Sequence, residues 1–103
     1  MRNSEYYKDP TAYEAIRNVM RLENMDLQDT VEMMLSDDYR ERFKAEFYQL
    51  QIRVEKLQAM IDDWSHLTFK PKVSREFYLI QINIMKAYLR ALEYRARIEG
   101  INV

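Results

Sequence analysis

The chain has 103 residues, 48% apolar and 32% charged, with one Gly and two Pro, a composition typical of a single all-α domain with long helices. The absence of Cys excludes disulfides and thiolate chemistry, and a net charge of -1 argues against duplex nucleic acid as a partner. No signal peptide or run of 18 apolar residues occurs, so we expect a soluble cytoplasmic protein with no membrane partner.

The first 35 residues are predicted to form one or two short helices. One helix begins near residue 10, where either Asp9 before Pro10, or Thr11 with Glu14, would cap it. A helical period then loosens and resumes through Leu27, Val31, Met34 and Leu35. Five of the seven methionines fall in this segment, which favours packing against the rest of the chain over an adaptable contact surface.

A long helix is predicted from about Tyr39 to Asp63, after a polar break and capping signal at residues 36–38. Its apolar residues alternate spacings of four and three without interruption. They are Phe43, Phe47, Leu50, Val54, Leu57, Ile61 and Trp64. Such a regular heptad pattern indicates packing against another long helix.

A second long helix is predicted from Ser74, its N-cap, to about Glu99, where Gly100 ends it. Pro71 interrupts the helical pattern before it. The same four-three spacing recurs in Tyr78, Ile82, Met85, Leu89, Leu92 and Ala96. The sequence therefore predicts an antiparallel helical hairpin over residues 38–100, within a single domain that spans residues 1–103.

The second long helix carries another apolar stripe, one residue earlier at each step. It consists of Phe77, Gln81, Ile84, Tyr88, Ala91, Arg95 and Ile98. The first long helix has a lesser second stripe of Ala45, Tyr48, Ile52 and Ala59. Because a small monomer has little else to cover these faces, we expect a coiled-coil homo-oligomer beyond a dimer. The alternative is that the short N-terminal helices cover both faces.

The residues offer no catalytic constellation, so the sequence argues against an enzyme. His66 is the sole histidine and lacks the partners of a metal site. Asp37-Asp38 and Asp62-Asp63 are adjacent on helices and point about 100° apart, so neither pair forms an acid/base dyad. One glycine at position 100 excludes a phosphate-binding loop. We expect no metal and no cofactor.

Tyrosine and arginine on the two long helices suit a small anionic ligand that contains an aromatic ring. Guanidinium groups bind phosphates and phenol rings stack on bases. The candidates are Gln81, Tyr88, Arg90, Tyr94 and Arg95 on the second long helix and Arg53 on the first. The alternative is that these amphipathic side chains lie at helix edges without a ligand.

Two stretches, DYRERFKAEFYQLQIRVEKLQAMI and SREFYLIQINIMKAYLRALEYRARIEG, resemble small helical-hairpin proteins of phages and prophages that are catalogued as relatives of a crAss-like phage protein. Gln81, Met85, Tyr88 and the Leu-x-x-Arg from Leu92 to Arg95 match the pattern of their second helix. More distantly, the hairpin is similar to the phage anti-CBASS and anti-Thoeris sponges. Those proteins form oligomers that sequester cyclic nucleotide signals of host defence.

The resemblance implies a non-catalytic phage or prophage accessory protein that sequesters a cyclic nucleotide immune signal in the bacterial cytosol. On this hypothesis a tyrosine, Tyr88 or Tyr94, stacks on a base and the side chain of Gln81 contacts a base edge. Phosphates would be neutralised by Arg53, Arg90 and Arg95. The alternative is an oligomeric protein-interaction module that docks on a host or phage protein through its Met-rich N-terminal helices.

Overall fold

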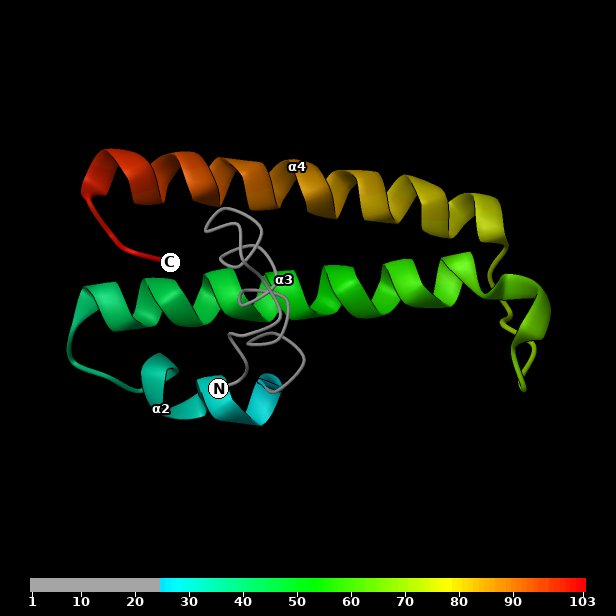
Figure 1. Cartoon of the computed structure of the whole chain (residues 1–103), viewed down its shortest axis with the longest axis horizontal. Coiled ribbons are helices and arrows are strands. Elements are labelled where there is room, and N and C mark those ends of the chain that lie inside the picture. The colour runs from blue at the N-terminus through cyan, green and yellow to red at the C-terminus, as the bar shows by residue number, and fades with distance from the viewer. Residues whose placement is uncertain (1–24) are drawn as a thin grey trace, which may run out of the picture.

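A computed structural model describes residues 25–103, in which all regular structure is helical (Figure 1). Its elements are η2 (Leu27–Thr30), α2 (Val31–Met34), α3 (Tyr39–Asp62), η3 (Trp64–His66) and α4 (Arg75–Glu99). The predicted all-α class is confirmed. The helix expected near residue 10, with both of its possible caps, lies outside the described residues. None of the described helices is long and apolar enough to span a membrane.

Local capping sets the ends of the two long helices where the sequence predicts them. Asp38 accepts a hydrogen bond from the backbone N–H of Arg40 at 2.9 Å, and Ser74 accepts one from Phe77 at 3.2 Å. Gly100 ends α4 in the left-handed conformation, with a φ of 71°, which a residue with a Cβ adopts at a cost.

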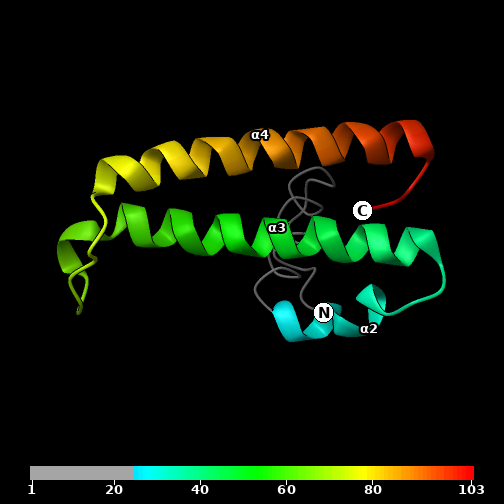
Figure 2. The ribbon, with the colours of Figure 1, turned by 180° about the vertical axis from the view of Figure 1, so that it is seen from behind.

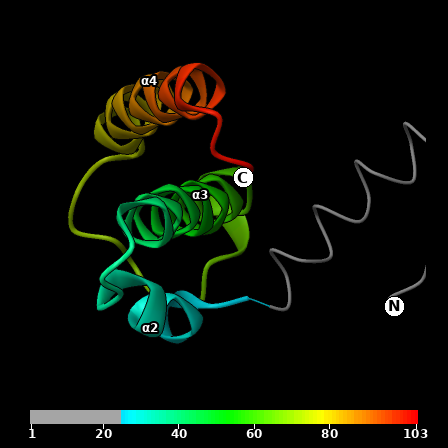
Figure 3. The ribbon, with the colours of Figure 1, turned by 90° about the vertical axis from the view of Figure 1, so that its left-hand side faces the viewer.

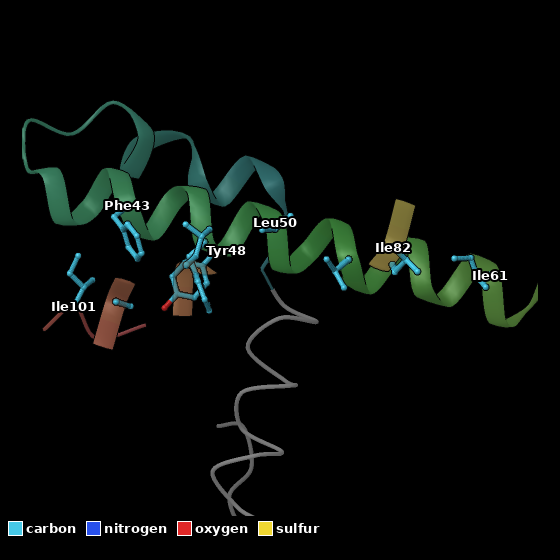
Figure 4. Close-up of a cluster of buried hydrophobic side chains, with 10 residues drawn as sticks. Phe43, Tyr48, Leu50, Ile61, Ile82 and Ile101 are labelled. Carbon is cyan, nitrogen blue, oxygen red and sulfur yellow. The ribbon is translucent and has the colours of Figure 1, made fainter. Parts of the chain in front are cut away.

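The core lies between α3 and α4, which run side by side in opposite directions (Figures 1 and 2). Every residue of the two predicted heptad patterns is buried or half-buried. Ile61 and Leu92 are each 1% exposed, and the cluster extends past the end of α4 to Ile101 (Figure 4). The four-three spacing therefore identifies the residues that hold the long helices together.

On its opposite side, α3 packs against the short elements η2 and α2, so it lies between α4 and α2 (Figure 3). Ala45 and Ile52, from the lesser stripe of α3, are buried. The side chain of Gln49 donates a hydrogen bond of 2.8 Å to the hydroxyl of Thr30, which is fully buried. Within residues 25–103, the short helices thus cover the first part of the second face of α3, leaving Ala59 exposed, and do not cover that of α4.

The short segment turns a different face inward from the one that its apolar pattern indicates. Thr30 is buried and Met33 packs against the core, whereas Met34 and Leu35 are 45% and 75% exposed. The segment starts as a 3-10 helix, with three residues per turn, and this rotates the face that follows relative to an α-helix.

Candidate functional site

Two lines of side chains, each spaced by seven residues, border one edge of the contact between α3 and α4. We call them together the polar edge: Tyr39, Glu46 and Arg53 on α3, and Gln81, Tyr88 and Arg95 on α4. Because the helices run in opposite directions, the two lines face each other in reverse order. Hydrogen bonds join the first two pairs, Tyr39 with Arg95 and Glu46 with Tyr88. The same stagger, continued by seven residues on each helix, sets Arg53 opposite Gln81 as a third pair. Successive pairs are about 10 Å apart, since a helix rises 1.5 Å per residue.

The first pair, Arg95 with Tyr39, is already engaged within the protein. Arg95 Nη2 donates a hydrogen bond of 2.7 Å to the Tyr39 hydroxyl, which donates one of 2.9 Å to Glu99 Oε1. The Arg95 guanidinium also lies 4.8 Å from the centre of the Phe43 ring and 3.7 Å from Glu99 Oε2. The hydrogen bond to Tyr39 is the main cause that raises the pKa of Arg95. A phosphate here would compete with the carboxylate of Glu99.

The second pair joins Tyr88 to Glu46. The Tyr88 hydroxyl donates a hydrogen bond to Glu46 Oε2, and this bond is the largest cause that raises the pKa of Tyr88. The hydroxyl of Tyr88 is thus held by Glu46, while 45% of the residue remains exposed. An exposed ring of this kind can stack on a base, but the neighbouring carboxylate repels a phosphate.

The third pair, Arg53 with Gln81, is open. Arg53 is exposed, and its side chain forms no ion pair or hydrogen bond with any other described residue. The Gln81 amide has one weak contact in that range, to Met85 Sδ at 3.8 Å. A guanidinium presents a fork of donors to a phosphate, and an amide can both donate to and accept from a base edge. Of the three pairs, this one has the groups free for an anionic ligand.

Arg90 and Tyr94 do not join the polar edge. At about 100° per residue they lie roughly 160° and 120° around α4 from Tyr88. Tyr94 is covered on one side by the Arg97 guanidinium, 5.4 Å from its ring centre. Four of the six predicted ligand residues thus lie along the polar edge, spread over about 20 Å of helix, whereas these two lie on another side of α4.

Three residues of the site were missed by the sequence reasoning: Tyr39, Glu46 and Glu99. A signal for two of them was present, because Tyr39, Glu46 and Arg53 repeat at the seven-residue spacing of the apolar pattern beside them. No group of three His, Cys, Asp or Glu that could hold a metal occurs among residues 25–103. His66 is the last residue of η3 and is exposed, and its Nδ1 lies 3.2 Å from Asp63 Oδ1.

Of three comparisons with known proteins, the one against family models found a match. Neither the search of curated proteins nor that of solved structures found a match. The model of the Sequestin family matches residues 37–98, which include α3, the connecting loop and nearly all of α4. This match contains all three pairs of the polar edge. Glu99, which contacts both residues of the first pair, lies one residue beyond it. The match spans more than half of the chain, which therefore belongs to the Sequestin family.

Proposed function

We propose that this chain is a phage or prophage accessory protein that sequesters a cyclic nucleotide immune signal without chemistry, as an oligomeric helical hairpin. The name of its family suggests sequestration. The resemblance to sponge proteins supports the ligand class and the bacterial cytosol as the place of action. Holding a signal in an inactive complex requires affinity and abundance but no catalytic group.

The observation that carries the proposal is the open pair of Arg53 and Gln81, with the exposed ring of Tyr88 about 10 Å further along the same edge. A cyclic nucleotide has phosphates that suit a free guanidinium and bases that stack on an aromatic ring. The first two pairs hold Arg95 and Tyr88 with carboxylates nearby. We therefore assign the main phosphate contact to Arg53, the base edge to Gln81 and the stacking to Tyr88, with Arg95 as a secondary charge.

The test is binding to a panel of cyclic di- and trinucleotides and cyclic ADP-ribose isomers, by thermal shift and then calorimetry. A ligand at about 100 times its dissociation constant adds roughly 2.7 kcal/mol to the stability, a shift of several degrees for a small domain. Arg53→Ala should weaken binding about 10- to 100-fold through loss of charge-assisted hydrogen bonds. Arg40→Ala, an exposed arginine off the polar edge, is the control. A panel without any shift contradicts the proposal.

A second function is favoured by the apolar surface of the short segment, where Leu35 is 75% and Met34 is 45% exposed. These side chains suit a protein partner better than a nucleotide. If the chain is a protein-interaction module, Met34→Ser with Leu35→Ser should abolish recovery of a stoichiometric host or phage protein. Phe69→Ser, at another exposed apolar residue, should leave the recovery unchanged.

A further inference from the structure

The side of α4 that faces away from α3 carries a continuous apolar stripe, which we call the outer stripe. Its members are spaced three, four, three, four, three and four residues apart: Phe77, Ile80, Ile84, Ala87, Ala91, Tyr94 and Ile98. All seven are exposed, Ile84 and Ile98 by 64% and 65%. No described element lies over this side of the helix (Figure 3).

The outer stripe differs at alternate positions from the stripe that the sequence indicates. Gln81, Tyr88 and Arg95 belong to the polar edge. In the outer stripe their places are taken by the residues one position earlier, Ile80, Ala87 and Tyr94. The line contains no charged residue over three heptads. A strict repeat of 3.5 residues on an α-helix is the pattern of a coiled-coil contact.

We propose that the outer stripe binds the outer stripe of a second copy, with the two α4 helices antiparallel. The stripe extends from Phe77 to Ile98, about 32 Å of helix, so its partner must be a helix of similar length. Among the described elements, α3 has that length, but its heptad pattern is buried against α4. The matching stripe is therefore the same one on another chain, as in an isologous dimer.

Side-chain size favours an antiparallel register in which Ile84 faces Ala87 of the second copy. The same register sets Ile80 against Ala91 and Phe77 against Tyr94, each pair occurring twice by symmetry. Large residues thus meet small ones in the middle of the contact, and two aromatic pairs close it. Such alternation fills an interface without voids or overlap.

The flanking charges favour the same orientation. In the antiparallel register, Glu76 lies beside Arg97 of the second copy at both ends of the contact. In a parallel pair with the same stripe, Arg90 would instead lie beside Arg95 of the second copy. Like charges at such positions oppose association, so the parallel arrangement is disfavoured.

If the proposed function holds, this register also completes the ligand site. Gln81 and Tyr88 each follow a stripe residue by one position, so they lie between the outer stripe and α3. The antiparallel contact brings Tyr88 of the second copy to within about two residues, or 3 Å along the axis, of Gln81. Each open pair of Arg53 and Gln81 thereby gains an aromatic ring from the other chain, and a dimer has two such sites.

Mass measurement by light scattering at micromolar concentrations tests the contact in the full chain. We expect twice the chain mass of 12.6 kDa, a dimer and not the larger oligomer that the sequence alone suggests. Ile84→Glu should raise the dissociation constant at least 100-fold and give the single-chain mass, with its helical circular dichroism retained because Ile84 is exposed in each copy. Phe69→Glu, in the loop before α4, is the matched control and should stay dimeric.

A monomeric wild type, or an associated state that Ile84→Glu leaves intact, overturns the proposal. A monomeric wild type that Ile84→Glu destabilises would show that another part of the same chain covers the stripe. Dimers that bind no nucleotide would contradict the proposed function and leave the contact standing. Nucleotide binding by the monomeric Ile84→Glu variant with unchanged affinity would show that the second copy adds nothing to the site.

The orientation is tested by reversing the end charges. Glu76→Arg alone and Arg97→Glu alone each place like charges at both ends and should weaken the dimer about tenfold. An equimolar mixture of the two variants restores opposite charges at both ends and should form the mixed dimer. Failure of the mixture to associate better than either variant, with equal helicity, overturns the antiparallel register.

Discussion

At the scale of single residues, one hydrogen bond controls the ionisation of the site's aromatic group. Glu46 accepts from the hydroxyl of Tyr88 and raises its pKa above the ordinary value of about 10. Glu46→Gln removes the charge that opposes the phenolate, so the pKa of Tyr88 should fall toward that value. Carbon-13 NMR titration of labelled tyrosines measures it. Glu93→Gln, a carboxylate without a contact to Tyr88 among the described residues, is the control and should not alter it.

The sign of the linked stability change follows from this shift. A pKa that is higher in the folded state stabilises it at pH values below the unfolded pKa, near 10, and this contribution is lost as the pH rises through the folded value. The wild type should therefore lose stability on alkaline titration more than Glu46→Gln does. An equal alkaline loss in both proteins, with an unchanged Tyr88 titration, would show that the hydrogen bond is absent in solution.

The sequence could predict that Gln81, Tyr88 and Arg95 share one edge of the last helix, but not which residues of α3 they meet. Tyrosine and arginine at seven-residue intervals pointed to the helix edge where Tyr88 and Arg95 lie. Periodicity within one helix says nothing about the stagger between two helices, which sets Tyr39 against Arg95 and Glu46 against Tyr88. For that reason Arg95 looked free in the sequence, although in the structure it is held by its neighbours.

At the scale of the helices, the long heptad pattern carries the stability. Leu92 is 1% exposed in the contact of α4 with α3, so Leu92→Ala should lower the free energy of unfolding by about 2 to 5 kcal/mol through lost burial and a cavity. Urea denaturation followed by circular dichroism measures this change. Leu35→Ala is the same truncation at a residue that is 75% exposed, and it should cost less than about 1 kcal/mol. Equal costs would contradict the assignment of the core.

The ends and inner faces of the long helices could be predicted because strong local signals agree with the tertiary contacts. Asp38, Ser74 and Gly100 each act through their own backbone geometry, and the heptad spacing needs no knowledge of the partner. The short segment has a local capping box, formed by Asp26 and Asp29, but its apolar spacing does not match the face that it buries. Its first turn is a 3-10 helix, which rotates Met33 inward in place of Met34, and its buried Thr30 bonds to Gln49 of α3, a tertiary contact that the segment's own pattern does not indicate.

At the scale of the whole molecule, the two long helices are covered to different extents. Within residues 25–103, α3 is covered on two sides, by α4 and by the short elements, whereas α4 is covered on one (Figure 3). A chain of 103 residues buries a smaller share of its surface than a larger domain does and is correspondingly less stable. Association through the outer stripe would add buried apolar area on the side of α4 that the other residues of 25–103 leave uncovered.

A dimer of this kind makes the melting temperature depend on protein concentration. Each tenfold rise in concentration favours the dimer by about 1.4 kcal/mol, a shift of roughly 3 to 5 °C for two chains that unfold together. Calorimetry across a hundredfold range of concentration should therefore show a steady rise for the wild type and for Phe69→Glu. Ile84→Glu should melt at one temperature throughout, because its unfolding involves a single chain. A wild-type melting temperature that does not change with concentration would mean that the second copy contributes nothing to the stability of the fold.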